Sequence, residues 1–221
     1  MPTAEERRRR LVEVYREASV CTRCPLAKTR TNVVFGAGNA NADLMFVGEA
    51  PGAEEDRRGL PFVGRAGGLL TELLGEIGLA REDVFIANVL LCRPPGNRDP
   101  QPGEIESCNP WLDAKFDLIQ PRVVATLGNF ATKLLTGNRA GITRVRGTPQ
   151  VHELGGRTVF VMPLLHPAAA LRTPSLMDTL REDFAKLPEL LQRPLPEPGL
   201  DAAELVVGVA EPDASQLDLF A

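Results

Sequence analysis

Short runs of β-branched, aromatic and other apolar residues recur along the chain and predict its strands. The four runs are Asp43–Gly48, Val84–Leu90, Val123–Gly128 and Thr158–Pro163. Each run is bounded by Gly, Pro or Asn and is apolar at successive positions rather than only at alternate ones. Strands of this kind are typical of a parallel sheet that is covered on both faces.

Stretches with helical spacing lie around and between these runs. The N-terminal segment opens with the capping-box sequence Thr3-Ala4-Glu5-Glu6, which predicts a helix that continues to about Ala18. Further helices are expected at Ala66–Ile77, Gly103–Leu118, Phe130–Leu135 and Leu176–Leu191. Because strands alternate with helices, we expect an α/β fold: a three-layer α/β/α sandwich around a four-stranded parallel sheet with right-handed crossovers.

The composition changes near residue 195 and divides the chain into a body and a tail. Residues 195–221 are rich in proline and small residues and hold six of the 29 acidic residues but no basic one. We therefore expect one domain over residues 1–194 and a disordered acidic tail over 195–221. The body keeps 23 acids against 25 bases, a net charge of +2, which permits DNA binding without requiring it.

The four cysteines indicate an inorganic centre. No run of 18 apolar residues and no signal peptide is visible, so we expect a cytoplasmic protein that does not enter a membrane. Thiols stay reduced in that compartment. Cys21 and Cys24 form a C-x₂-C pair, and Cys92 and Cys108 follow with 15 residues between them. This grouping favours a metal or cluster site over two disulfides, with zinc as one possible occupant.

Polar residues follow the apolar runs at the points where ligands bind in parallel α/β sheets. The first run leads into Gly48-Glu49-Ala50-Pro51-Gly52 and then Pro61-Phe62-Val63-Gly64-Arg65, where glycines and a helix start suit an anion such as phosphate. An ordinary turn with solvated acids is the alternative. Asn88 and His166 are either ligand-reading side chains at strand ends or polar groups satisfied within the core.

Several motifs occur in order between Cys21 and Leu191. They are the C-x₂-C pair, GEAPG followed by ED, PFVGRAG, N-x₃-CRPP-x-NR, the later cysteine and HPAA-x-LR. In this set and order the chain resembles the family 4 uracil-DNA glycosylases, the iron–sulfur branch of that superfamily. The resemblance implies a [4Fe–4S] cluster held by Cys21, Cys24, Cys92 and Cys108.

The resemblance also implies an activity, namely hydrolysis of the N-glycosidic bond of uracil in single- and double-stranded DNA, which leaves an abasic site and starts base excision repair. The flipped uracil would stack on Phe62, pair with Asn88 and receive a hydrogen bond on O2 from His166. Gly48, Glu49 and Ala50 would line the same cavity. Another branch of the superfamily has an aspartate in place of Ala50, so Glu49 is our first candidate for positioning the water and Glu55 the second.

The remaining expectations concern DNA and protein partners. Candidate DNA contacts are Arg65, Arg93, Arg98 and Arg172, with Leu171 as a wedge into the vacated base stack. The tail ends in Gln216-Leu217-Asp218-Leu219-Phe220, which resembles the pentapeptide that docks on the bacterial sliding clamp; a chance match or a terminal strand is the alternative. Family analogy implies a monomer. A non-catalytic module that binds uracil-containing or single-stranded DNA is the alternative function.

Overall fold

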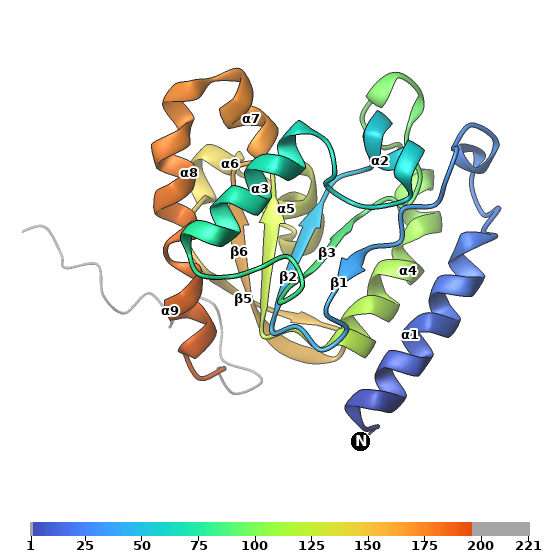
Figure 1. The fold of residues 1–221 in the computed structure, drawn as a ribbon, viewed down its shortest axis with the longest axis horizontal. Coiled ribbons are helices and arrows are strands. Elements are labelled where there is room, and N and C mark those ends of the chain that lie inside the picture. Colours follow the sequence, from blue (N-terminus) through green and yellow to red (C-terminus); the bar gives the residue numbers. More distant parts are fainter. Residues whose placement is uncertain (1, 196–221) are drawn as a thin grey trace, which may run out of the picture.

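A six-stranded sheet forms the centre of the molecule (Figure 1). The structure, a computed structural model, describes residues 2–195. The strands run β1 (Ala37–Gly38), β2 (Leu44–Gly48), β3 (Phe85–Asn88), β4 (Val123–Leu127), β5 (Gln150–Leu154) and β6 (Arg157–Leu164). Their order in the sheet is β1-β3-β2-β4-β6-β5.

The four predicted strands are the four inner, parallel ones, so the predicted α/β class is confirmed. The predicted strand count of four was too low, because β1 and β5 add an antiparallel strand at each edge. β1 is two residues long, and β5 is half-buried at most and joined to β6 through Gly155-Gly156, both at positive φ. Short or half-exposed edge strands carry little apolar signal, which explains why the apolar runs did not reveal them.

The helices pack on both faces of this sheet. The α-helices are α1 (Ala4–Ser19), α2 (Ala53–Arg58), α3 (Arg65–Glu76), α4 (Pro102–Ile119), α5 (Asn129–Thr136), α6 (Ile142–Val145), α7 (Pro167–Arg172), α8 (Met177–Phe184) and α9 (Leu187–Gln192). Three short 3₁₀ turns are η1 (Pro25–Lys28), η2 (Pro95–Asn97) and η3 (Pro174–Leu176).

The structure confirms the predicted start of the first helix and divides the last predicted helix in two. The capping box of α1 is present, with Thr3 and Glu6 each bonding the other's backbone. The single helix expected at Leu176–Leu191 is instead divided into α8 and α9. Pro188 explains the division, because its nitrogen has no hydrogen to donate to the carbonyl of Phe184 four residues earlier.

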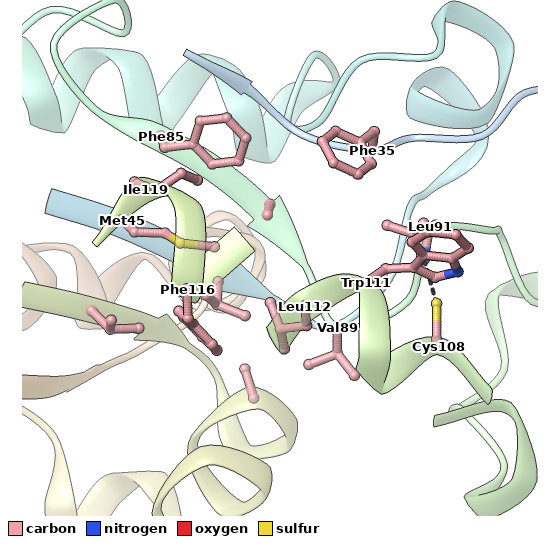
Figure 2. Close-up of a cluster of buried hydrophobic side chains, with 14 of the residues drawn as sticks. Phe35, Met45, Phe85, Val89, Leu91, Cys108, Trp111, Leu112, Phe116 and Ile119 are labelled. Carbon is pink, nitrogen blue, oxygen red and sulfur yellow. Dashed lines mark hydrogen bonds between the residues drawn. The ribbon is translucent and has the colours of Figure 1, made fainter. Parts of the chain in front are cut away.

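Successive residues of each inner strand enter two separate cores. Met45 and Val47 of β2 pack under α1, α4 and α5, whereas Leu44 and Phe46 pack under α3, α8 and α9. This alternation is the two-residue period of a strand with both faces buried. Figure 2 shows part of the first core, where the face of α4 that carries Trp111 and Phe116 lies against the sheet. No helix within residues 2–195 is long and apolar enough to cross a membrane.

Candidate active site and cysteine cavity

The polar ends of the inner strands meet in one cavity of about 400 Å³, a size suited to a small ligand. It lies at the carboxyl ends of the parallel strands, where ligand sites of such sheets form. Eight of the predicted residues line it: Glu49, Ala50, Glu55, Phe62, Asn88, Arg98, His166 and Arg172. The structure therefore brings together residues that lie more than 120 positions apart in the sequence.

Phe62 is held in an unusual backbone conformation beside the cavity. Its φ is 51°, in the left-handed region that costs a non-glycine residue about 1 kcal/mol or more. The Glu55 carboxylate accepts hydrogen bonds from the backbone N–H groups of Val63, at 2.9 Å, and Gly64, at 2.8 Å. Gly67 of α3 packs so closely on the Phe62 backbone that a Cβ there would collide with it. The loop that carries Phe62 is thus fixed by the two hydrogen bonds to Glu55 and by the close packing of Gly67.

Gly48 lies directly against two side chains of the cavity, those of Phe62 and Asn88. A Cβ at this position would lie 2.8 Å from the Phe62 ring and would also collide with Oδ1 of Asn88. Gly48 is paired with Asn88 in the register of β2 and β3. The close approach of the Phe62 ring and the Asn88 amide therefore requires a glycine at this position. Gly48 was expected to line the cavity, but it contacts two of the lining side chains and does not line the cavity itself.

Asn88 ends β3 with an unsatisfied polar atom. The side chain is 2% exposed, and its Oδ1 has no hydrogen-bond partner within residues 2–195. An unpaired buried polar atom costs about 1–3 kcal/mol, so this oxygen needs a donor that the described chain does not supply. This observation favours the ligand-reading interpretation of Asn88 over the core-asparagine interpretation.

His166 is the N-cap of α7, and its ring protonation follows from one hydrogen bond. Nδ1 accepts from the backbone N–H of Ala168 at 3.1 Å, so the proton of the neutral ring resides on Nε2. Burial, and after it the charge of Arg172, lowers the pKa of His166 to about 4, and the charge of Glu55 opposes both effects. At neutral pH the ring is therefore an uncharged donor. Its centroid lies 5.6 Å from that of Phe62, in a stacked arrangement.

The two candidate carboxylates differ in how they are held. Burial, and after it the charge of Asp99, raises the pKa of Glu49, whose side chain makes no hydrogen bond within the described chain. Glu55 has one oxygen committed to the Val63 and Gly64 amides. A Cβ on Gly52 would lie 2.7 Å from the other oxygen, so Glu55 fills the space that a side chain at position 52 would take. Glu49 is the freer of the two carboxylates.

The predicted DNA-contacting residues fall into two groups. Arg98 forms an ion pair with buried Glu104 at 2.6 Å, and Arg93 donates to Asn97 at 2.7 Å, so both guanidinium groups already bond protein atoms. Arg65 and Arg172 are exposed and make no hydrogen bond or ion pair within residues 2–195. Leu171 is half-buried against the second core. Arg65 and Arg172 are the better candidates for phosphate contacts.

All four cysteines line a second, small cavity between α1, η1, α4 and the segment that follows β3. The Cys92 sulfur accepts from the Arg30 guanidinium at 3.4 Å, and the Cys108 sulfur accepts from the backbone N–H of Leu91 at 3.3 Å, the latter drawn in Figure 2. Burial raises the pKa of the Cys92 thiol, and that of Cys108 to about 11. N–H groups directed at sulfur suit thiolate ligands of an iron–sulfur cluster.

Lys115 adds a cationic group to the surroundings of this cavity. It is fully buried, its Nζ has no hydrogen-bond partner within residues 2–195, and that atom lies 4.4 Å from the centre of the Phe35 ring. Lys115 lies two turns after Cys108 on the same face of α4, and helical side chains lean towards the N-terminus. Burial lowers the pKa of Lys115 to about 7 and Cys108 opposes that shift, so an anionic centre on the cysteines would favour the charged amine. Within the described part of the chain the four thiols share this cavity, but no three His, Cys, Asp or Glu side chains are arranged to hold a single metal ion.

Several residues of the two sites escaped the sequence-based prediction. Gly128 and Asn129 line the active-site cavity at the end of β4, a fourth strand end that resembled the other three in position but carried no long polar loop. Arg30 and Lys115 adjoin the cysteine cavity. An arginine six residues after the C-x₂-C pair and a lysine at helical spacing from Cys108 were signals, but charged residues are usually solvated and attract little notice.

Comparison with known proteins agrees with this geometry. The profile of the uracil DNA glycosylase superfamily matches residues 35–192. The type-4 uracil-DNA glycosylase of Sulfurisphaera tokodaii is 47% identical over 189 residues, which cover 83% of this chain and 86% of that protein. The type-4 enzymes of Archaeoglobus fulgidus and Thermotoga maritima are each 46% identical over 190 residues, covering 84% of this chain and 96% and 97% of their own lengths.

Proposed function

The chain belongs to the uracil-DNA glycosylase superfamily and to its type-4 branch, and from this premise we propose how its pocket releases uracil from DNA. The prediction of an enzyme, rather than a non-catalytic binding module, is confirmed by that membership. The observation that carries the proposal is the convergence of Phe62, the unsatisfied Asn88 amide oxygen and the neutral His166 ring on one cavity.

Base reading is assigned to Phe62 and Asn88. A base inside a duplex is inaccessible, so the enzyme acts on a nucleotide turned out of the stack. The Phe62 ring stacks on the uracil, Asn88 Oδ1 accepts from N3–H, and its Nδ2 donates to O4. Cytosine presents an acceptor at N3 and a donor at C4, which would leave the buried amide unpaired, and such mismatches give strong discrimination. The unsatisfied oxygen at 2% exposure supports this role.

Leaving-group stabilisation is assigned to His166. As the C1′–N1 bond breaks, its electron pair moves onto the base, and negative charge reaches O2. The Nε2–H of the neutral His166 ring donates to that oxygen. A prepositioned donor aimed at developing charge is worth about 3–4 kcal/mol. The hydrogen bond from Ala168 to Nδ1 supports this role, because it selects the required tautomer.

The water is assigned to Glu49. In the hydrolysis, a water oxygen bonds C1′ and its proton passes to the carboxylate, while the released uracil anion takes up a proton. Glu49 is free of protein hydrogen bonds in the described chain, whereas one oxygen of Glu55 is engaged. Glu55 is instead assigned to thymine exclusion, because its carboxylate takes up the space over Gly52. A 5-methyl group directed there would meet a charged group.

DNA binding, on single- and double-stranded substrates, is assigned to two exposed arginines: Arg172, which lines the cavity, and Arg65, which precedes the lining residue Ala66. Phosphate contacts of this kind position the nucleic acid without reading its sequence. Leu171 would enter the vacated stack with its exposed part. Replacing both arginines with glutamine should weaken binding of abasic and uracil-containing DNA equally and lower its salt dependence. Unchanged salt dependence would contradict the assignment.

A [4Fe–4S] cluster on Cys21, Cys24, Cys92 and Cys108 is the proposed occupant of the second cavity. The cluster would brace the segment after β3 against α4 and the N-terminal region, and no reacting atom would reside on it. The four thiols around one cavity, the two N–H···S bonds and buried Lys115 support it. Iron and sulfide analysis with visible absorbance of the anaerobically purified protein tests it, and zinc without sulfide would contradict it.

Clamp docking is proposed for the C-terminal segment Gln216, Leu217, Leu219 and Phe220, which lies outside the described residues together with most of the predicted tail. Apolar anchors on an acidic segment suit a hydrophobic groove. Deletion of residues 216–221 should abolish pull-down by a bacterial sliding clamp and leave excision on short oligonucleotides unchanged. Equal pull-down after the deletion would rule the proposal out.

The reaction itself is tested by uracil release from single-stranded, U·G and U·A oligonucleotides, with T·G as the matched control. We expect release from the three uracil substrates and none from T·G. Release of thymine would refute the role of Glu55, and absence of uracil release would refute the proposed mechanism.

A further inference from the structure

The adjacent carboxylates Glu55 and Asp56 on the short helix α2 accept hydrogen bonds from two different segments of the chain. Helix α2 lies near the ends of β2 and β3 (Figure 1). Successive helical residues are about 100° apart, so neighbouring side chains leave the helix on different sides. Glu55 bonds the loop that carries Phe62. Asp56, the next residue, is 5% exposed and does not line the active-site cavity.

Asp56 accepts hydrogen bonds from residues 31–32, in the segment that follows the Cys21–Cys24 pair in the sequence. Its Oδ1 accepts from the backbone N–H groups of Thr31, at 2.9 Å, and Asn32, at 3.4 Å. The Asn32 side chain returns two bonds to α2, donating to the carbonyls of Asp56 at 2.9 Å and Arg57 at 3.1 Å. Four hydrogen bonds thus join one turn of α2 to residues 31–32.

The same segment is continuous with the cysteine cavity. Cys24 is the N-cap of η1, and the backbone N–H of Arg30 bonds the carbonyl of Leu26 at 3.1 Å within that turn. The Arg30 guanidinium then bonds the Cys92 sulfur. Only a few ordered residues therefore separate the cysteine ligands from Asp56.

We propose that Asp56 is a positioning residue, which fixes α2 against the segment after the cysteine pair so that Glu55 keeps Phe62 in its stacking position. The proposal rests on the proposed role of Phe62. Phe62 has a φ of 51°, a conformation that persists only where the surroundings enforce it. Asp56 has no ion-pair partner within residues 2–195, so its buried carboxylate has no role in charge pairing.

A double-mutant cycle tests this coupling. Single-turnover uracil release from a single-stranded oligonucleotide is measured for wild type, Asp56→Ala, Phe62→Ala and the double variant. If Asp56 acts through Phe62, Asp56→Ala slows release about tenfold in the wild-type background and not at all when Phe62 is already alanine. Asp56→Asn keeps an oxygen that accepts from both amides and should restore most of the rate.

Asp183→Asn is the matched control for loss of stability. Asp183 of α8 is a fully buried carboxylate that accepts from the guanidinium of Arg146, the C-cap residue of α6, at 2.7 Å. This variant should melt at a lower temperature and release uracil at the wild-type rate. If Asp56→Ala does not fold, Asn32→Ala removes two of the four bonds from an exposed position, and the same cycle is run with it.

The outcomes separate the two proposals. Multiplying losses in the double variant would overturn the role of Asp56 while leaving the proposed function intact. Equal slowing by Asp183→Asn would overturn it as well, because the effect would then follow stability alone. No uracil release by the wild-type chain would instead refute the proposed function.

Discussion

The active-site cavity and the cysteine cavity are built on neighbouring parts of the chain but in opposite ways. Asn88 and Cys92 lie four residues apart, yet the first lies in a polar cavity of about 400 Å³ and the second in a small cavity enclosed by apolar side chains. Two groups of the first, Glu55 and His166, are held by hydrogen bonds from backbone N–H groups. The sulfur atoms of the second receive only two from the described chain.

This difference separates chemistry from support. A cavity whose donors and acceptors are oriented by the protein keeps its geometry when one reacting side chain is replaced, so a substitution there should alter the rate and spare the stability. A cavity lined by four thiols, two of them buried, depends on the group that binds them, so a substitution there should alter the stability first. Four substitutions or conditions test that division, in order of decreasing expected effect.

His166→Ala should produce the largest change, a fall in kcat of about 10²–10³-fold, because it removes the donor to the leaving base. The thermal midpoint should stay near the wild-type value, because the His166 side chain is partly exposed and makes a single hydrogen bond, to the backbone. Single-turnover kinetics and calorimetry measure the two effects. A wild-type rate would exclude His166 from the mechanism. A large fall in the thermal midpoint would show that substitutions in the active-site cavity affect stability as well as rate.

Cys108→Ser should destabilise the fold by about 3 kcal/mol, which lowers the thermal midpoint by roughly 6–12 °C for a chain of this size. The serine loses the N–H···S bond from Leu91 and a ligand of the proposed cluster. Thermal melting followed by circular dichroism, with iron analysis of the same sample, measures this. An unchanged midpoint together with a lost rate would assign the cysteines to the chemistry and break the comparison.

Gly48→Ala should lower kcat/KM by about 10- to 100-fold, because the new methyl group displaces the Phe62 ring and the Asn88 amide together. Gly75→Ala is its matched control: it lies in α3, and a Cβ there meets no atom within 4 Å. The control should keep full activity and gain about 0.5–1 kcal/mol of stability. Equal kinetics of the two variants would refute the requirement for a glycine at position 48.

Acidification should reveal the burial of His166 as a small loss of stability. Its pKa is about 4 in the folded protein against an ordinary value of 6.5, so the unfolded chain binds more protons between these values. Stability is therefore complete above about pH 6.5 and falls by about 2 kcal/mol by pH 5. Urea midpoints of wild type and His166→Ala at pH 7 and pH 5 measure this contribution. A parallel loss in both proteins would show that another group causes it.

The sequence predicted the part of the site that consists of strand ends. Asn88 lies within the apolar run Val84–Leu90 and His166 follows the run Thr158–Pro163, and such runs locate both the strand and the sheet edge near which it ends. The motifs around Phe62 and the cysteines then suggested the family. The short helix α2 and the split between α8 and α9 were not predicted, because six to eight residues give too weak a period to distinguish a helix from a loop.

The chain's local chemistry by itself determined the inner strands and the residue types of both sites, because apolar runs and motifs are properties of neighbouring residues. Tertiary structure alone decided which nitrogen of His166 carries the proton, and that the Glu49 carboxylate and the Asn88 side-chain oxygen have no hydrogen-bond partner within residues 2–195. It also decided that Asp56 connects the two regions. Hydrogen bonds between distant segments settle these properties, and no sequence period records them.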